Sequence, residues 1–421
     1  MILEFRCENY KSIKDEVILS MLATKDNDYE NTLIEFDKKR ILPVVSIYGA
    51  NGSGKTNLIN AIGYVNYLVR SSNNFEPKAL IPTFPHKLEN KKNSSFMIQF
   101  VSDNIRFAYG FELNNRKIVE EYLYHFKNNR QATIFERSEN NYNFGKAYKK
   151  ELLEIENKMG KDNKLFLPVA AIWGKFSDII SAYKYLSEDI VINQSIEDRT
   201  WSNYTIESIA RSKENKNTFI DLLNRLSIKV DDISAKVEKR NINYEDLPIA
   251  IPEALKMFML GGEEIKHEVK LKYNNIEVDL TEESRGIQKL FEIGGPLIDV
   301  LVNGKTLIYD ELETSLHPFV AEAIVKLFMD KEMNKKNAQL IFVTHDTNLL
   351  DLNLFRKDEI WFVEKKDEEF SSTLYSLSDL KNIRKNENIE AGYVKGKYGA
   401  VPFIGNEMLK KWIGDCNDSK E

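Results

Sequence analysis

The chain contains little cysteine. Cys7 and Cys416 are its only two cysteines in 421 residues, and they lie far apart in the sequence. This spacing excludes a disulfide framework and does not match any common pattern of cysteine metal ligands. Such sparing use of cysteine is typical of a reducing compartment, so we expect the protein to be cytoplasmic.

Long hydrophobic runs and an excess of positive charge are also missing. No stretch approaches the roughly 18 apolar residues of a membrane-spanning helix, and no membrane role is expected for the chain by itself. Met1 to Cys7 lack the basic and apolar regions of a signal peptide. The formal net charge of -6 provides no global field that would attract nucleic acid, although local basic clusters could bind phosphate.

The residues that are present favour a folded protein of two parts. Hydrophobic residues make up 42% of the chain and charged residues 29%, which is enough for packed cores and argues against large-scale disorder. A chain of this length is suited to one α/β core and a second lobe that is inserted or appended.

Apolar patterns predict several strands before any helix-rich region. Met1–Arg6 and Glu16–Met21 form an expected hairpin, and Ile41–Tyr48 is a nearly continuous apolar run, as in a strand buried within a parallel sheet. From Ser95 to Glu136 apolar and polar residues alternate, which predicts antiparallel sheet. Helical spacing follows up to Leu226, without the sustained heptads of a coiled coil, and strand patterns then return.

A complete phosphate-loop pattern follows the apolar run at Ile41–Tyr48. The glycines would let backbone N–H groups turn toward a β-phosphate, Lys55 would reach the β/γ oxygens, and Thr56 would bind Mg²⁺. The sequence therefore predicts a site for ATP and Mg²⁺. The residues assigned to it are Gly49, Ala50, Asn51, Gly52, Ser53, Gly54, Lys55, Thr56 and Asn57.

Two further apolar runs end in residues that could carry out hydrolysis. Leu307–Tyr309 leads to Asp310, which would hold Mg²⁺ through its water shell, and to Glu311, which would orient or deprotonate the attacking water. Ile341–Val343 leads to His345, placed to contact the γ-phosphate or its water. Each of these motifs alone could be structural, but their order along the chain favours an ATP hydrolase.

Together the motifs resemble the RecF/SMC/OLD branch of ABC-type ATPases over nearly the whole chain. The matching segments are Phe5–Ser12, Gly49–Thr56, Glu283–Gln288, Asp310 to Pro318 and Thr344–Asp346. The resemblance implies that Ser284 and Gly286 belong to the signature loop, that Ser315 and Leu316 belong to the D-loop, and that His345 is the switch histidine. It also implies a homodimer with composite ATP sites, because the signature loop of one subunit closes on the γ-phosphate held by the other.

The fold class that this resemblance implies is α/β, with an ABC-type P-loop ATPase core, an antiparallel β-lobe and a short helical insertion. We expect residues 1–145 to form the N-terminal half of the core with the β-lobe. Residues 146–265 would form the helical insertion with flanking strands. Residues 266–421 would form the second half of the core, with the signature, Asp310, His345 and the tail.

A closer resemblance is to RloA- and AbiLi-like ATPases of bacterial defence. It is carried by the short insertion and by Tyr393, Gly396–Val401 and Pro402, whose glycines could equally form a tight turn that docks the tail. The resemblance implies an ATPase switch in abortive-infection defence against phage. Few residues follow His345, so we expect a separate effector protein rather than a fused nuclease domain, with a Toprim-type nuclease as the first candidate.

Two other functions stay open at this point. A RecF-like DNA-repair ATPase would bind DNA directly, which the acidic charge balance disfavours. An ATPase subunit of a transporter is disfavoured by the β-rich first lobe and by the Ser-Arg-Gly-Ile-Gln sequence at Ser284–Gln288, which departs from the transporter signature. Gln99 and Gln131 are both candidates for the glutamine loop that senses Mg²⁺ in such ATPases.

Overall fold

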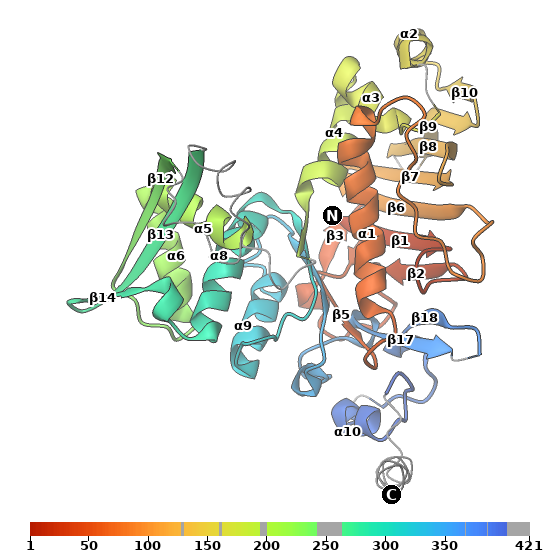
Figure 1. Ribbon diagram of the computed structural model, residues 1–421. Coiled ribbons are helices and arrows are strands. Elements are labelled where there is room, and N and C mark those ends of the chain that lie inside the picture. Colours follow the sequence, from red (N-terminus) through yellow and green to blue (C-terminus); the bar gives the residue numbers. More distant parts are fainter. Residues whose placement is uncertain are drawn as a thin grey trace, which may run out of the picture. The chain divides into compact units, whose positions relative to one another are not determined.

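The computed structural model describes residues 1–127, 130–159, 162–193, 200–241, 263–366, 368–384 and 386–401. The chain divides into two compact units, and Figure 1 labels many of their helices and strands. Unit 1 comprises Met1–Gln194, Ile308–Glu311 and Gln339–Glu421, and unit 2 comprises Ser195–Leu307 and Leu312–Ala338. Pro402, the last residue of the predicted C-terminal motif, lies outside the described residues.

The first sheet of unit 1 is antiparallel, as the alternating pattern predicts. It has seven strands in the order β10-β9-β8-β7-β6-β1-β2, and the predicted hairpin is confirmed by the pairing of Phe5 with Leu19. Its strands are β1 (Ile2–Glu8), β2 (Val17–Ser20), β6 (Ser94–Ser102), β7 (Ile105–Leu113), β8 (Ile118–Lys127), β9 (Arg130–Ser138) and β10 (Asn141–Phe144). A separate small hairpin joins β3 (Ile34–Phe36) to β4 (Lys39–Ile41).

One face of this sheet is a ladder of apolar side chains. Phe96 pairs with Phe111 and Phe100 with Phe107 across β6 and β7, and all four rings are buried. Helix α1 (Lys55–Ser71) lies across this sheet in Figure 1, and its Tyr64 ring centroid is 5.2 Å from that of Phe96. The alternation read from the sequence thus places the aromatic rings in the core.

The second sheet belongs to unit 1 except for Thr306 and Leu307, is mixed and has the order β11-β15-β16-β5-β17-β18. Strand β5 is parallel to both β16 and β17, and β18 is antiparallel to β17. Every residue of β5, β15 and β16 is buried, as expected for strands covered on both faces. The strands are β5 (Val44–Tyr48), β11 (Ile190–Asn193), β15 (Thr306–Tyr309), β16 (Gln339–Val343), β17 (Ile360–Lys366) and β18 (Ser371–Ser376).

Buried polar side chains join the parts of unit 1. The Glu121 carboxylate accepts hydrogen bonds from the backbone N–H groups of Phe166 (2.6 Å) and Leu167 (2.9 Å), at the amino end of helix α3 (Phe166–Trp173). The carboxamide of Gln339 bonds both backbone groups of Ile2, at 2.6 and 3.0 Å. Both residues satisfy backbone groups that would otherwise be buried without partners.

Helices confirm the helical pattern predicted up to Leu226. Those of unit 1 are α2 (Lys149–Met159), α3 (Phe166–Trp173), α4 (Ser177–Lys184) and the C-terminal α10 (Ile389–Val394), with a π-helical turn at Tyr185–Asp189. Short 3₁₀ turns in unit 1 lie at Glu30–Thr32, Ser72–Asn74, Thr347–Leu349, Lys357–Glu359 and Leu377–Asp379. In the described residues, no helix combines the length and hydrophobicity needed to cross a membrane.

Unit 2 packs helices against a three-stranded antiparallel sheet. The helices are α5 (Thr200–Arg211), α6 (Lys213–Arg225), α8 (Arg285–Asn303) and α9 (Pro318–Met329). The strands are β12 (Asp232–Asn241), β13 (Glu263–Tyr273) and β14 (Ile276–Asp279), and a 3₁₀ turn covers Leu280–Glu282. Glycines in α8 allow close packing, because a Cβ at Gly295 would lie 2.3 Å from Thr205 Oγ1. The expected α/β fold with an antiparallel β-lobe is therefore confirmed.

A buried ion pair fixes the start of β17. The Arg356 guanidinium bonds the Asp358 carboxylate at 2.8 and 2.9 Å, and Asp358 also accepts from the backbone N–H of Thr24 at 2.7 Å.

Glu359, the residue after Asp358, is buried, with 1% of its surface exposed. Its Oε2 accepts from the backbone N–H of Arg356, and its Oε1 has no hydrogen-bond partner in the described part of the chain. Burial raises the pKa of Glu359 to about 8.

Glu359 should therefore make the stability of the protein pH-dependent. The folded chain keeps a proton that the unfolded chain releases near pH 4.5, so the free energy of unfolding falls as the pH rises from about 4.5 to about 8. Glu359→Gln mimics the protonated side chain and has no proton to lose. Between pH 6 and pH 8, the free energy of unfolding of Glu359→Gln should fall less steeply than that of the parent chain, by up to about 1.4 kcal/mol per pH unit. Denaturant unfolding at the two pH values measures this slope.

The exposed Glu35 provides a matched control, since Glu35→Gln should leave that slope unchanged. Equal pH dependence in the Glu359→Gln variant and the parent chain would show that Glu359 is ionised in the folded protein.

Candidate active site

The loop between β5 and α1 carries the residues predicted to bind phosphate. Gly52 and Gly54 have φ angles of 77° and 109°, which favour glycine. A Cβ at Gly54 would lie 2.1 Å from Ser372 Oγ, and one at Gly49 would lie 2.4 Å from the carbonyl oxygen of Val363. The loop is thus held closely by β17 and β18. The amino end of α1 follows at once, and the first N–H groups of a helix have no acceptor within the helix, so they suit an anion.

Lys55 and Ser53 are buried within this loop. Lys55 is 5% exposed, and its Nζ donates to the carbonyl oxygens of Gly49 (2.8 Å) and Ala50 (3.1 Å). Ser53 is 2% exposed, and its Oγ has no hydrogen-bond partner among the residues that the structure describes. A buried hydroxyl without a partner is rare in native proteins and calls for a ligand or water.

The side chain of Asp310 lies beside this loop, at the end of β15. It forms a hydrogen bond with Thr56 and is close enough to Lys55, Glu311 and His345 for their charges to act on it. Burial raises the pKa of Asp310, the Thr56 hydrogen bond opposes this, and Glu311 adds to the rise. Its Oδ1 is buried without a hydrogen-bond partner within the described ranges. The fold therefore brings together five predicted site residues in unit 1.

Glu311 and His345 are held by different kinds of local structure. Glu311 has a φ of 56°, a left-handed conformation that costs energy in a residue other than glycine and is often found at functional sites. His345 is exposed and follows Thr344, whose backbone N–H donates to the Ile47 carbonyl at 3.1 Å. That bond fixes the end of β16 beside the end of β5.

These residues fit a nucleotide with its cation. The hydroxyl of Thr56 and the unpartnered Oδ1 of Asp310 are oxygen donors of the kind that Mg²⁺ prefers, and Lys55 with the glycine loop suits phosphate. In the described part of the chain, no group of three or more His, Cys, Asp or Glu is placed to hold a metal ion. At nucleotide sites, phosphate oxygens and water usually complete the coordination of Mg²⁺.

The signature residues predicted from the family resemblance lie in unit 2. Ser284 caps helix α8, and its Oγ accepts from the backbone N–H of Ile287 at 3.4 Å. Gly286 is in the first turn, where a Cβ would lie 3.0 Å from the carbonyl oxygen of Ser315. Ser284 and Arg285 are exposed. The amino end of α8 is therefore accessible, and Arg285 presents a positive charge there.

Two residues at the loop were not found from the sequence. Ser372 Oγ donates to the Ser53 carbonyl at 2.5 Å and lies 2.8 Å from Ser12 Oγ, which also accepts from the Asn57 side-chain amide at 2.7 Å. Ser12 lies in a segment that carries the family resemblance, but no pattern marks Ser372.

Asn57, predicted to bind the nucleotide, uses its side-chain amide for the hydrogen bond to Ser12. Gln99 and Gln131 lie within β6 and β9.

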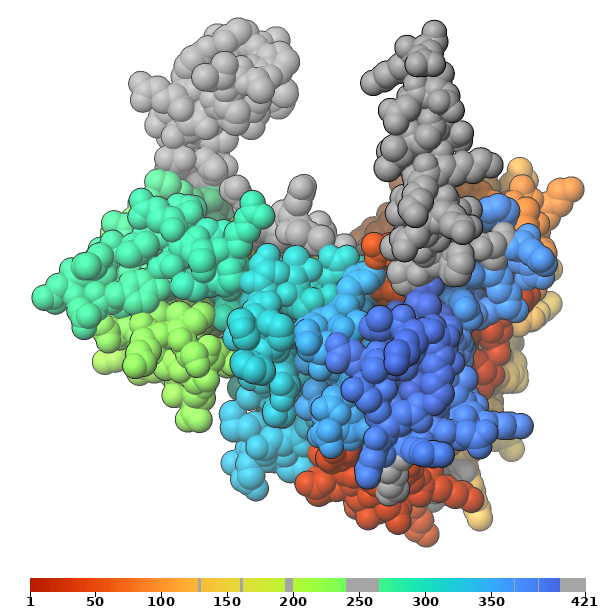
Figure 2. Space-filling model, turned by 90° about the horizontal axis from the view of Figure 1, so that it is seen from below, coloured from red at the N-terminus to blue at the C-terminus, as the bar shows by residue number. Residues whose placement is uncertain are grey.

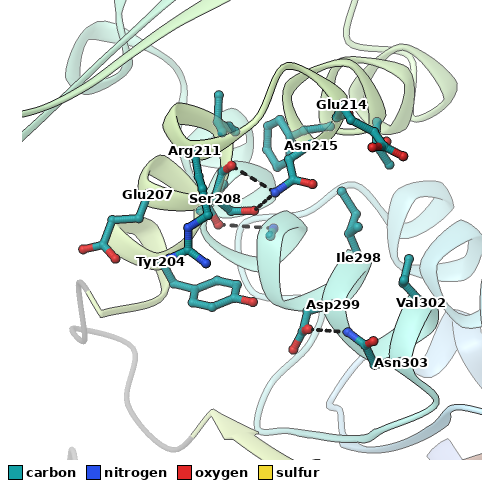
Figure 3. A pocket seen from close by; sticks show the side chains of 15 residues that line it. Tyr204, Glu207, Ser208, Arg211, Glu214, Asn215, Ile298, Asp299, Val302 and Asn303 are labelled. Atoms are coloured by element: carbon teal, nitrogen blue, oxygen red, sulfur yellow. Dashed lines mark hydrogen bonds between the residues drawn. The ribbon is translucent and has the colours of Figure 1, made fainter.

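A separate pocket of about 310 Å³ lies in unit 2. Figure 3 shows its lining, which includes Tyr204 and Arg211 from α5 and Asp299 from α8. Asp299 accepts from the Asn303 amide at 2.7 Å. None of the predicted site residues lines this pocket.

A family model matches residues 44–154 and 193–351 of the chain and is described as "AAA domain, putative AbiEii toxin, Type IV TA system". The matched ranges cover more than half of the chain. They include the phosphate loop, both signature residues, Asp310, Glu311 and His345. No curated protein matches the chain.

Solved structures of SMC heads are similar to the chain at low identity. The SMC head bound to the C-winged helix domain of ScpA has 15% identity and a TM-score of 0.42, over 89% of this chain and 97% of that chain. The SMC head domain from Thermotoga maritima has 14% identity and a TM-score of 0.42, over 89% of this chain and 98% of that chain. An SMC head with an extended coiled coil, bound to the C-terminal domain of ScpA derived from Pyrococcus furiosus, has 13% identity and a TM-score of 0.39, over 89% and 96%.

The environment of Asp310 predicts how removal of its charge changes the stability of the protein, with and without Mg-ATP. Because burial raises the pKa of this carboxyl group, the ionised side chain destabilises the folded protein until a cation binds. Asp310→Asn should therefore be at least as stable as the parent chain without ligand, and should lose the stabilisation by Mg-ATP. That stabilisation is about 2.7 kcal/mol when ATP is present at 100 times its Kd. Thermal unfolding with and without Mg-ATP measures both effects.

Asp15→Asn is the control for this experiment, since Asp15 is exposed and should respond to Mg-ATP as the parent chain does. Full stabilisation of Asp310→Asn by Mg-ATP would exclude Asp310 from the cation site.

Proposed function

The chain belongs to the family of AAA domains described as putative AbiEii toxin of a Type IV TA system, and from this we propose that it binds Mg-ATP and hydrolyses it to switch conformation. The observation that carries the proposal is the meeting of Lys55, Thr56 and Asp310 at one glycine-rich loop. This loop precedes a helix amino end, and Asp310 offers it a buried oxygen without a partner among the described residues. Phosphate and a divalent cation satisfy all of these groups at once.

In this proposal the phosphate loop holds the nucleotide and Lys55 changes partners when ATP binds. Its Nζ leaves the carbonyl oxygens of Gly49 and Ala50 and takes the β/γ-phosphate oxygens. Backbone N–H groups from Ala50 to Gly54 and the amino end of α1 bind the remaining phosphate charge. Because Lys55 is already buried at the loop, its positive charge needs little rearrangement to reach the phosphates.

Hydrolysis falls to the residues at the ends of β15 and β16. Thr56 and Asp310 hold Mg²⁺, which neutralises charge on the β/γ oxygens when it is bound. Glu311 orients or deprotonates the attacking water, and His345 contacts the γ-phosphate or that water. The raised pKa of Asp310 is consistent with a site that awaits a cation.

Ser284 and Gly286 complete the site from a second copy of the chain. The support for this part is the accessible amino end of α8, where Ser284 and Arg285 are exposed. Such a helix end binds an anion, and here the anion is the γ-phosphate of the other subunit. A homodimer that closes around ATP follows, and it is compatible with a higher oligomer.

The output of the switch is control of a separate effector protein in abortive-infection defence against phage. The name of the matched family, which refers to a toxin–antitoxin system, supports a role of this kind. A Toprim-type nuclease is the first candidate for the effector. The docking surface is the helical insertion from about Lys146 to Leu226, and in the part of it that belongs to unit 1 Leu153 is 45%, Ile172 53% and Trp173 48% exposed. A pull-down that recovers no protein in any nucleotide state would contradict this part of the proposal.

Glu311→Gln separates binding from hydrolysis. The amide keeps the size of the side chain but cannot accept the proton, so ATP should bind with unchanged affinity while its hydrolysis slows by roughly 10²–10⁴-fold. Phosphate release and equilibrium binding, measured on the same preparation, test both. Glu332→Gln, at an exposed position in unit 2, should hydrolyse ATP as the parent chain does. Hydrolysis by Glu311→Gln at the parent rate would assign the base to another residue.

The same variant tests the dimer. Since it retains ATP, Glu311→Gln should sediment as a dimer when ATP is present and as a smaller species without it. Adding Ser284→Arg should prevent this change, because the new side chain fills the space of the γ-phosphate, while each subunit still binds ATP. A sedimentation coefficient that does not respond to ATP would refute closure of the dimer around the nucleotide.

A further inference from the structure

The C-terminal motif packs directly behind the phosphate loop. Helix α10 and the residues after it, up to Val401, belong to unit 1 and appear in dark blue on the face shown in Figure 2. The Tyr393 ring stacks on Phe362 of β17, with centroids 5.6 Å apart and planes at 20°. It also meets the Tyr48 ring at 6.1 Å and 63°. Tyr48 is the last residue of β5 and immediately precedes Gly49.

Phe362 is the centre of this aromatic cluster. Its ring lies 6.3 Å from Tyr48, 5.7 Å from Tyr375 and 6.2 Å from Tyr398. Tyr48, Phe362 and Tyr398 are all at most 3% exposed. Aromatic side chains from β5, β17, β18 and the C-terminal segment thus pack against one another. A displacement of the segment would therefore displace the end of β5.

Two glycines form the tight turn that docks this segment. Gly396 and Gly399 have φ angles of 76° and 73°, and a Cβ at Gly399 would lie 2.7 Å from the Tyr375 hydroxyl. The turn is closed by the Tyr393 hydroxyl, which donates to the Ala400 carbonyl at 3.0 Å, while the Tyr375 hydroxyl donates to the Tyr398 carbonyl at 2.7 Å. The glycine spacing of the motif is therefore explained by its docking on β17 and β18.

The same segment holds the loop that carries His345. The Thr347 hydroxyl donates to Glu390 Oε1 of α10 at 3.0 Å. Thr347 opens the 3₁₀ turn two residues after His345, and Asp346 caps that turn by accepting from the backbone N–H of Asn348 at 3.0 Å. Between His345 and Glu390 there is therefore a short chain of fixed contacts, all within unit 1.

We propose that two residues of the segment 387–401, Glu390 and Tyr393, position the active site. Glu390, through Thr347, positions the His345 loop, and Tyr393, through Tyr48, positions the phosphate loop. The inference rests on the proposed ATPase function. Neither residue touches the nucleotide, and each acts on a different part of the reaction. Because His345 contacts the reacting γ-phosphate, Glu390 controls kcat, whereas Tyr393 acts on the loop that binds all of the phosphates and so controls KM.

The first test uses Glu390→Ala, which removes the acceptor for Thr347. Small displacements of a reacting group slow enzymes strongly, by about 10²-fold for 1 Å, so we expect kcat to fall at least tenfold with KM for ATP unchanged. Thr347→Val should give the same loss, and the double variant should lose no more than either single one. Glu390→Gln keeps the Oε1 acceptor and should restore most of kcat.

The second test uses Tyr393→Leu, which removes the ring that contacts Tyr48, and Tyr393→Phe, which keeps it. The leucine variant should raise KM at least fivefold with little change in kcat, and the phenylalanine variant should stay within twofold of the parent chain. Val394 is the matched control, since it lies on the same helix and is 66% exposed. Val394→Ser should leave both constants unchanged.

The outcomes separate this inference from the proposed function. A parent chain that neither binds nor hydrolyses ATP refutes the function. An active parent chain with parent-like kinetics in Glu390→Ala and Tyr393→Leu refutes the positioning role and leaves the function standing. Equal losses in Glu390→Ala and Glu390→Gln, or parallel changes of kcat and KM in proportion to lost thermal stability, would show a merely structural role and would also overturn it. The Glu390 and Thr347 variants keep the test valid if Tyr393→Leu fails to fold, because both side chains are partly exposed.

Discussion

The buried oxygen of Asp310 sets the main constraint on this structure. Within the described residues its Oδ1 has no hydrogen-bond partner, and burial raises the pKa of the carboxyl group. Such an oxygen is costly unless a cation or a proton completes it. The hydrogen bond with Thr56 places it next to the phosphate loop, where a bound nucleotide would bring both Mg²⁺ and compensating charge. The proposed chemistry follows from this arrangement.

The fold of unit 1 supplies the rigidity that such a site requires. Three buried strands, β5, β15 and β16, end at the residues assigned to phosphate, cation and water, and two of them are paired in parallel. The loop itself is held from outside by Ser12 and Ser372, and the His345 loop by Glu390. Because these contacts are made between groups of the protein and need no nucleotide, the site can be preorganised before ATP arrives.

Local features of the site could be predicted from the sequence, and long-range ones could not. The strand–loop–helix unit around Lys55 is encoded in consecutive residues, since the glycines, the buried run and the helical spacing adjoin one another. The alternation from Ser95 onward likewise predicts the antiparallel sheet. By contrast, the contact of Ser12 with Ser372 joins residues separated by 360 positions, and no sequence pattern marks Ser372. The stacking of Tyr393 behind Tyr48 depends in the same way on packing that only the folded chain defines.

Calorimetric titration of ATP into the intact chain, with Mg²⁺ present, is the most direct test of the central claim that this loop is a nucleotide site. The parent chain should bind ATP saturably, and Lys55→Ala should lose that binding, because it removes the buried cation at the loop. Omitting Mg²⁺ should weaken binding to the parent chain. Equal affinity of Lys55→Ala and the parent chain, or no binding by either, would contradict the account.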